Sequence, residues 1–261
     1  MGSLVSREGK TILGPEQALR TLRFEGQGAR LEERTSVLVW NIQKQKAHGF
    51  AEAFQRLALG RQLLLLQEVH LSGAAEFLTD SGHGYEMAAS FAYPDGSSTG
   101  VAIGSTAVPN QVKLGITEDV EPVVGTPKAF LMAEYNLPAP GQRLLAATIH
   151  GINRADWKSH GAFERQLDNL VEQLETHQGP MILAGDFNTQ NKKKNAYLEA
   201  AVERLRLVPV VFDPDIRTVS KLTRHPLDHA FVRGLRVEDP VCWSGGSDHV
   251  ALTFSVLVET S

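Results

Sequence analysis

The sequence is poor in cysteine and has no long apolar run. Cys242 is the only cysteine in 261 residues, so no internal disulfide can form and burial of a core must stabilise the fold. A reducing compartment is the expectation, and we predict a cytoplasmic protein. The first residues lack the apolar run of a signal peptide, and no segment approaches the ~20 apolar residues of a membrane span. We therefore predict no membrane association.

The chain also lacks an excess of positive charge. Its formal net charge is −4, so its composition supplies no general field that would attract polyanions such as nucleic acids. The visible local exception is the basic run Lys192, Lys193 and Lys194. Such a run is usually a solvated helix face, but its position also allows it to contact a polyanionic substrate.

The apolar pattern predicts one folded domain over residues 35–261, preceded by a polar N-terminal extension over residues 1–34. Several predicted strands follow one another without an intervening helix, which favours mixed sheets packed face to face with helices outside. The predicted helices are 47–60, 157–177 and 192–207. The predicted strands are 36–40, 62–68, 85–92, 99–105, 129–137, 143–150, 180–187, 208–212, 227–233 and 249–258.

Polar side chains stand where these apolar runs end or begin. Because the ends of buried strands meet at the rim of a sheet, such side chains can gather there although they are far apart in the chain. Each one alone is more often a cap, a turn residue or a packed histidine. The set comprises Asn41, Glu68, His150, Asp186, Asn188, Asp228, Asp248 and His249.

Taken together, these residue types indicate metal-dependent phosphoester chemistry. Four crowded carboxylates repel one another unless a cation compensates, and hard oxygen ligands suit Mg²⁺, with Mn²⁺ as an alternative. The absence of CxxC and HExxH patterns disfavours zinc. A histidine can hydrogen-bond a phosphoryl oxygen or move a proton near neutral pH. The sequence therefore predicts hydrolysis of a P–O bond.

Several motifs resemble one known family. They are WNI at 40–42, QE at 67–68, His150, GDFN at 185–188, LDHAFVRG at 227–234 and SDH at 247–249. In order and spacing they resemble the endonuclease/exonuclease/phosphatase superfamily, whose members include pancreatic-type deoxyribonuclease, apurinic endonucleases, inositol polyphosphate 5-phosphatases and neutral sphingomyelinases. The resemblance covers about residues 35–258. It implies a four-layer α/β sandwich, two face-to-face mixed β-sheets flanked by helices, with the site at one edge.

Within the superfamily, His150 is similar to the histidine of deoxyribonuclease-like and phosphatase-like members, whereas apurinic endonucleases have a tyrosine there. The acid expected to support this histidine from a neighbouring strand has no obvious counterpart, since SSTGVAIGS offers only Ser97, Ser98 and Thr99. The overall pattern is that of a bacterial subgroup whose substrate it does not reveal.

The resemblance also implies a role for each residue of the set. Glu68 looks like the principal Mg²⁺ ligand, with Asn41 and Asp248 beside it in the metal pocket. Asp186 looks like the group that aligns or deprotonates the attacking water, and Asn188 like an amide that orients the phosphate. Asp228 resembles the carboxylate that pairs with His249, while His249 and His150 would contact the phosphate.

The substrate is less determined than the chemistry. Two basic sets are predicted to flank the cleft and to favour a polyanionic substrate: Lys192, Lys193 and Lys194 after Asn188, and Arg217, Lys221 and Arg224 before Asp228. Substrate contacts are predicted for Asn41, Asn188, Lys192, Lys193 and Arg224. We therefore predict a monomeric phosphodiesterase or nuclease acting on nucleic acid rather than lipid. The alternatives are a phosphomonoesterase of inositol phosphates or other small phosphorylated compounds, and a catalytically inactive binding protein.

Overall fold

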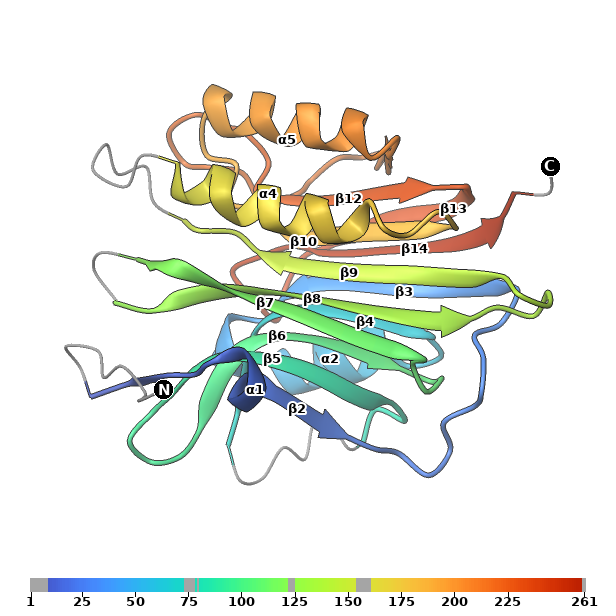
Figure 1. Cartoon of the computed structure of the whole chain (residues 1–261), viewed down its shortest axis with the longest axis horizontal. Coiled ribbons are helices and arrows are strands. Elements are labelled where there is room, and N and C mark those ends of the chain that lie inside the picture. The colour runs from blue at the N-terminus through green and yellow to red at the C-terminus, as the bar shows by residue number, and fades with distance from the viewer. Residues whose placement is uncertain (1–8, 73–77, 79, 122–124, 154–160, 260–261) are drawn as a thin grey trace.

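The computed structural model describes residues 9–72, 78, 80–121, 125–153 and 161–259. Two mixed β-sheets pack face to face and carry helices on their outer faces, as Figure 1 shows. The four-layer α/β sandwich predicted from the sequence is therefore confirmed. Within the described residues, no helix has both the length and the apolar character that a membrane crossing requires.

The larger sheet is centred on two parallel strands. In the described part of the chain its order is β1-β5-β6-β4-β3-β14-β13, and β2 pairs with β5. In the parallel pair β3 and β4, Asn41 at the end of β3 lies opposite Gln67, so Asn41 and Glu68 stand at the same rim. The strands are β1 (Thr11–Ile12), β2 (Leu19–Leu22), β3 (Arg34–Asn41), β4 (Leu63–Leu71), β5 (Gly84–Ala92), β6 (Ser98–Ser105), β13 (Leu235–Trp243) and β14 (Ala251–Val258).

The smaller sheet brings three candidate site residues into one row. Its order is β11-β12-β10-β9-β8-β7. Asp186 is the register partner of His150 on the parallel neighbour β9 and of Asp228 on the antiparallel neighbour β12. The strands are β7 (Gln111–Val120), β8 (Pro127–Asn136), β9 (Arg143–His150), β10 (Met181–Asp186), β11 (Val208–Pro209) and β12 (Asp228–Arg233).

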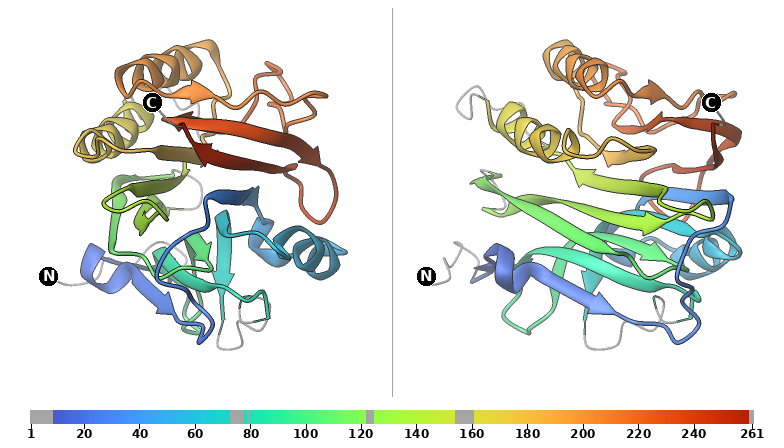
Figure 2. Two further views of the ribbon diagram at one scale, coloured as in Figure 1. Left: turned by 90° about the vertical axis from the view of Figure 1, so that its right-hand side faces the viewer. Right: turned by 45° about the vertical axis from the view of Figure 1, so that its right-hand side comes forward.

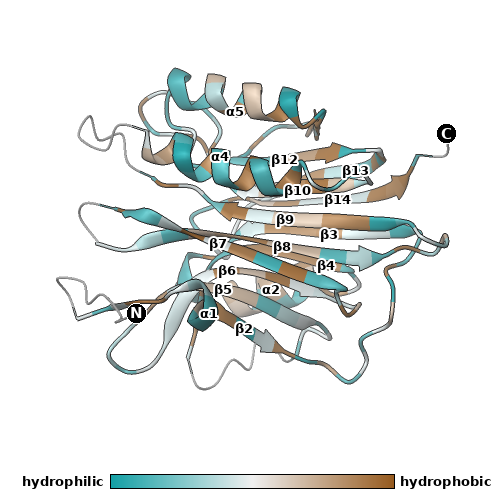
Figure 3. Ribbon diagram, viewed as in Figure 1, coloured by the Kyte–Doolittle hydropathy of each residue, from teal (hydrophilic) through white to brown (hydrophobic). Residues whose placement is uncertain are grey.

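The helices cover both outer faces. Helices α4 (Ala162–Leu174) and α5 (Lys192–Arg204) lie on the smaller sheet, and α2 (Phe50–Ala58) lies on the larger one, as Figure 2 shows. Helix α4 buries Phe163, Leu167 and Leu170, which recur at helical spacing. Each such side chain stabilises the fold by about 1.5–3 kcal/mol. Polar residues remain on the outer faces of α4 and α5 (Figure 3).

Among the residues that the structure describes, three apolar cores hold the layers together. One lies between the two sheets and includes Val39, Leu65 and Leu131. A second lies under α2, and a third lies under α4 and α5. Because the strands of both sheet centres are buried on both faces, they read as continuous apolar runs, which is why the sequence predicts them.

The structure adds elements that the apolar pattern did not predict. Part of the segment 1–34 forms β1, β2 and the short helix α1 (Pro15–Ala18), and both strands pair with β5 of the larger sheet. The strands β7 and β13 lie at sheet edges, where one face is solvated and the apolar signal is weak. Strand β13 also contains Pro240 and an irregular register. The beginning of the helix predicted for 157–177 lies outside the described residues.

Candidate active site

The eight candidate residues lie at the rim where the central strands of both sheets end. The larger sheet contributes Asn41 and Glu68, and the smaller sheet contributes His150, Asp186 and Asp228. The loop before β14 carries Asp248 and His249. The Ser247 hydroxyl donates a hydrogen bond to the carbonyl of Asn41 at 2.7 Å, which ties this loop to the end of β3.

Asp186 is the centre of the site. Its Oδ2 accepts hydrogen bonds from the side-chain nitrogens of Asn41 at 3.0 Å and of Asn188 at 3.2 Å. Its Oδ1 accepts one from the backbone N–H of Asn188 at 3.0 Å. His150 Nε2 and His249 Nε2 lie 3.5 Å and 3.8 Å from Oδ2. Burial raises the pKa of Asp186 to about 6, although the charge on His249 opposes this rise. A nearby positive charge would therefore stabilise its ionised form.

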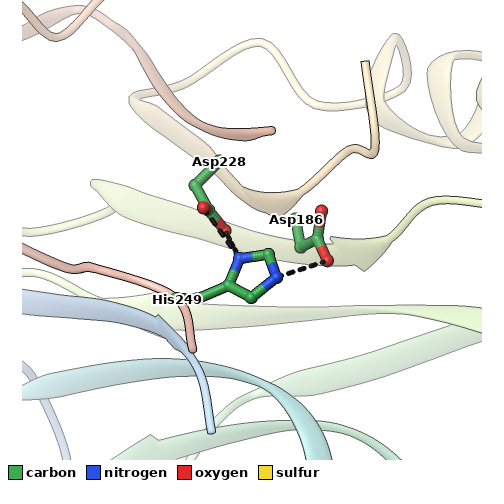
Figure 4. A group of neighbouring side chains, drawn as sticks. All are labelled: Asp186, Asp228 and His249. Carbon is green, nitrogen blue, oxygen red and sulfur yellow. Dashed lines mark hydrogen bonds and ion pairs between the residues drawn. The ribbon is translucent and has the colours of Figure 1, made fainter. Parts of the chain in front are cut away.

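His249 and Asp228 form a hydrogen-bonded pair, drawn in Figure 4. The Nδ1 of His249 donates to Asp228 at 2.9 Å and 3.0 Å, and Nε2 faces Asp186. Burial opposes a charge on His249, but Asp228, together with Asp186 and Asp248, overcomes it and raises the histidine pKa to about 10. The imidazole is therefore protonated at neutral pH and presents an N–H toward the centre of the site.

His150 has the opposite electrostatic character. Burial, aided by the charges of Lys128, His249 and Lys44, holds the pKa of His150 well below its ordinary value, so the ring is neutral. No supporting acid was found by sequence. The structure places the carboxylates of Asp186 and Glu68 3.5 Å and 3.8 Å from Nε2. It also places a cation beside the ring, since Lys128 Nζ lies 3.1 Å from Nε2 and 3.5 Å from Nδ1. The backbone carbonyl of His150 accepts a hydrogen bond from Gln166 at 2.9 Å.

Lys128 is a site residue that the sequence analysis missed. It is the second residue of the antiparallel strand β8, whose residue Phe130 pairs with Ile149, so Lys128 lies near the end of β9. The signal was the same as for Asp228, a charged side chain beside the start of an apolar run. Lys128 also pairs with Glu121 at 3.4 Å.

A bulge in the larger sheet directs Glu68. The register between β4 and β6 shifts between Leu66 and Val69, and Glu68 has φ 53 in the left-handed region. Its Oε1 lies 3.8 Å from His150 Nε2, and its side chain is half-buried. Asp248 is exposed, and its carboxylate lies 3.3 Å from the Ser247 hydroxyl. These two carboxylates therefore leave oxygens available at the solvent side of the rim.

Asn188 donates hydrogen bonds to Asp186 in this structure. Its amide nitrogen donates to the carbonyl of Gly151 at 3.0 Å and to Asp186 at 3.2 Å, and its backbone is left-handed at φ 52. Both amide hydrogens are thus used within the protein. The predicted contact of Asn188 with phosphate stays a prediction, while its observed contact is with the central carboxylate.

The site contains a group that can hold a metal ion. The ligand atoms of Asp186, Asp228 and His249 lie within 4.8 Å of one another. However, Nδ1 of His249 is engaged by Asp228, and a protonated imidazole has no free lone pair. Asn41 contacts Asp186 through its amide nitrogen and Glu68 lies 3.8 Å from His150, so binding of a metal by Asn41, Glu68 and Asp248 stays a prediction.

The basic residues near the site differ in their placement. Lys194 points inward, where its Nζ donates to the carbonyls of Ile152 at 2.5 Å and Asn188 at 3.1 Å, so it cannot face the cleft with its neighbours. Lys193 is exposed and pairs with Glu164 at 2.7 Å. Lys192 and Arg224 are exposed, and their contact with a substrate stays a prediction.

Comparison with known families assigns the fold to a class of phosphoesterases. Residues 38–249 match the model of the Endonuclease/Exonuclease/phosphatase family, and the chain belongs to this family. A UPF0294 protein of Vibrio vulnificus (strain YJ016) is 35% identical over 234 residues, which cover 88% of this chain and 79% of the relative. A UPF0294 protein of Yersinia pestis is 31% identical, covering 83% of this chain and 81% of the relative.

Solved structures show the same fold. An endonuclease/exonuclease/phosphatase family protein from Leptotrichia buccalis has a TM-score of 0.64 at 18% identity, covering 87% of this chain and 100% of the other. The human Nocturnin catalytic domain with bound sulfate has a TM-score of 0.63 at 19% identity, with 88% and 96% covered. TDP2 from C. elegans has a TM-score of 0.58 at 14% identity, with 86% and 75% covered. At these identities the likeness concerns the fold alone.

Proposed function

We propose that this chain is a divalent-metal-dependent phosphodiesterase that cleaves nucleic acid. The strongest support is that Glu68, His150, Asp186 and His249 lie side by side at one rim. The distances between the polar atoms of successive residues in this order are 3.5–3.8 Å. A structural protein has no need to bury Asp186 beside a charged histidine, because burying ionised groups costs several kcal/mol. The same rim carries all eight residues that the sequence singled out.

The donor set fits Mg²⁺ or Mn²⁺. The buried Asp186 has a raised pKa, which a cation beside it would lower, and Glu68 and Asp248 have carboxylate oxygens at the solvent side. We propose Glu68, Asn41 and Asp248 as the residues that hold the ion, with Asp186 facing it. When bound, such an ion would neutralise charge on the phosphoryl oxygens and favour the departing oxygen.

The protein side chains have complementary tasks in this proposal. Asp186, fixed by the two amides of Asn41 and Asn188, would orient the attacking water and accept its proton. His249, held charged by Asp228, would donate its Nε2–H to a phosphoryl oxygen as negative charge develops there. His150, neutral and 3.5 Å from Asp186, would form a second hydrogen bond with the phosphate.

Hydrolysis assays on a panel of substrates test this proposal. The panel contains supercoiled plasmid, single-stranded DNA, RNA, bis-p-nitrophenyl phosphate, inositol phosphates and sphingomyelin, each with Mg²⁺, Mn²⁺ or EDTA. We expect cleavage of the nucleic acids and of the diester, abolished by EDTA and lowered at least ~100-fold by Asp186→Asn or His249→Ala. Asp239→Asn and His48→Ala, both at exposed positions, are the matched controls.

Two outcomes would change the conclusion. Activity that survives both site substitutions would come from a contaminant or from another site. Hydrolysis of inositol phosphates without cleavage of nucleic acid would instead support the phosphomonoesterase alternative.

A further inference from the structure

Gln67 is a polar residue inside the apolar core between the two sheets. Its exposed fraction is 0%. On β4 it follows Leu63 and Leu65, whose side chains belong to this core, and the alternation of a strand directs Gln67 to the same side. A glutamine loses its hydrogen bonds to water when it is buried, and glutamine is mostly found at the surface. Its place in the core therefore needs a physical reason.

The side chain of Gln67 forms a hydrogen bond from one sheet to the other. Its Nε2 donates to the Thr148 hydroxyl on β9 at 2.8 Å and to the carbonyl of Leu65 on its own strand at 3.0 Å. Thr148 is fully buried as well. It follows Leu144 and Ala146, which line the same core. Gln67 and Thr148 therefore join the two sheets from within the core that lies between them.

This bridge lies next to the candidate active site. Gln67 directly precedes Glu68, and Thr148 stands two residues before His150, so Thr148 and His150 share one face of β9. At the rim, Glu68 Oε1 and His150 Nε2 are 3.8 Å apart. The separation of the two sheets at the bridge therefore determines how closely Glu68 and His150 approach each other.

The backbone around Glu68 depends on this bridge more than a regular strand would. The register between β4 and β6 shifts between Leu66 and Val69, and Glu68 has φ 53. The carbonyl of Gln67 accepts a hydrogen bond from the amide of Ile42 at 2.9 Å, which fixes the bulge to the end of β3. A bulge changes the direction of a side chain. The hydrogen bond to Thr148 adds an anchor on the opposite sheet.

The bridge is not optimal for stability. In the described part of the chain, no donor lies within hydrogen-bond distance of the buried Oε1 of Gln67. A buried carbonyl without a partner lowers the stability of a protein, whereas apolar groups of the same shape in place of both partners are often neutral or stabilising. Natural proteins depart from such packing rules mainly at functional sites. The polar pair therefore indicates a role in the geometry of the rim.

We propose that Gln67 is a positioning residue that, through Thr148, holds Glu68 and His150 at the separation that the reaction requires. This inference rests on the proposed function. A hydrogen bond has a defined length and direction, whereas apolar contacts are non-directional. An apolar pair would keep the sheets together, but it would define their relative position at the rim less closely.

The double substitution Gln67→Met with Thr148→Val tests this role without leaving either partner unpaired. Both new side chains are close in size to the native ones, so the urea midpoint of unfolding should be at least as high as that of the native protein. With bis-p-nitrophenyl phosphate and Mg²⁺, kcat should fall about 10- to 100-fold, because small displacements of reacting groups have effects of this size. KM should stay within about threefold.

Two single variants are the matched controls. Thr148→Ser keeps the hydroxyl and should retain kcat within about threefold, although loss of the methyl group should lower the urea midpoint. Thr35→Val removes a buried hydroxyl at the other end of β3, where Thr35 donates to the carbonyl of Glu32 at 2.9 Å. It should leave kcat unchanged. Activity would then follow the bridge and not the stability of the protein.

The other outcomes are distinct. Native kcat in the double variant would overturn the positioning role and leave phosphodiesterase activity established. A urea midpoint that falls together with kcat would show a purely structural role, and a raised KM with unchanged kcat would assign Gln67 to substrate binding; either result overturns the inference. If the native protein cleaves neither bis-p-nitrophenyl phosphate nor nucleic acid with Mg²⁺, the proposed function itself fails, and the positioning role fails with it.

Discussion

His249 is held between two carboxylates that are register partners on neighbouring strands. Its Nδ1 lies 2.9 Å from Asp228 on β12, and its Nε2 lies 3.8 Å from Asp186 on β10. Asp228 accepts a hydrogen bond from Nδ1 and raises the pKa of the histidine, so the ring is protonated at neutral pH. The hydrogen on Nε2 is therefore available to a substrate. This relationship decides the protonation state of the site.

Replacing Asp228 by asparagine should lower the pKa of His249 from about 10 toward the ordinary value near 6.5. In the native protein the raised pKa keeps His249 charged up to high pH. In Asp228→Asn, His249 should lose its charge, and the protein its activity, as pH rises above about 6.5. At pH 8 the charged fraction would fall about 30-fold. Proton NMR titration of His249 and the pH profile of kcat/KM measure both effects. Asp239→Asn is the control, and an unshifted His249 titration in Asp228→Asn would refute the explanation.

Lys194→Met should destabilise the loops that follow β9 and β10. The ammonium group bridges the carbonyls of Ile152 and Asn188 and lies 4.9 Å from the Phe163 ring. Loss of hydrogen bonds from a charged donor, with the carbonyls left buried, should lower the free energy of unfolding by about 2–3 kcal/mol in urea titrations. Lys193→Met, which loses only an exposed ion pair, should change it by less than about 1 kcal/mol. Equal losses in the two variants would contradict the bridging role.

The buried ring of His229 should make stability fall in mild acid. It lies between Phe187 and Phe231, 2.7 Å from the Thr189 hydroxyl, and burial, aided by Arg217, lowers its pKa to about 4. In the unfolded chain His229 has a pKa near 6.5, so the unfolded state binds the proton first as pH falls. The contribution of the neutral ring to stability is therefore complete above pH 6.5 and is lost as pH falls toward 4.

Between pH 7 and pH 5, the native protein should therefore lose about 2 kcal/mol more stability than His229→Asn. Urea unfolding at the two pH values measures the difference. His48→Asn, at an exposed position, should behave like the native protein. The same pH dependence in His229→Asn would show that another group titrates.

Gly185→Ala should prevent the close contact between β9 and β10 that aligns Asp186. Gly185 has φ 151, and an added Cβ would lie 2.3 Å from the carbonyl oxygen of Ile149. The strands cannot accept this without moving apart, and we expect the thermal midpoint to fall by several degrees at least. Gly14→Ala is the control, because its φ is −74 and no atom lies within 4 Å of the added Cβ. Equal midpoints of Gly185→Ala and Gly14→Ala would contradict the steric argument.

The rim residues could be found from the sequence because each one ends or begins an apolar run. Asn41, His150, Asp186 and Asp228 stand at the ends of strands that are buried on both faces, so local patterning marks their positions. The edge strands β7 and β13 gave no such signal, since half of each is solvated. The proposed roles of the rim residues are the next point to test.

The lysines show what local patterning does not contain. Lys193 and Lys194 are neighbours in the sequence, yet one is exposed and the other is buried, because successive residues of a helix point about 100° apart. No sequence pattern marks Lys10, Lys44 and Lys128 as neighbours. The pairing of the strands and the left-handed turn at Gln43–Gln45 bring them to one cavity.

The sequence by itself determined the fold class and the chemical groups of the site, because strand burial and residue type are properties of short segments. Which groups are charged, and which cations reach the centre, was decided only by the tertiary structure. The field at His150 and at His249 is a sum over residues from many elements. Such a sum depends on distances that sequence separation does not specify.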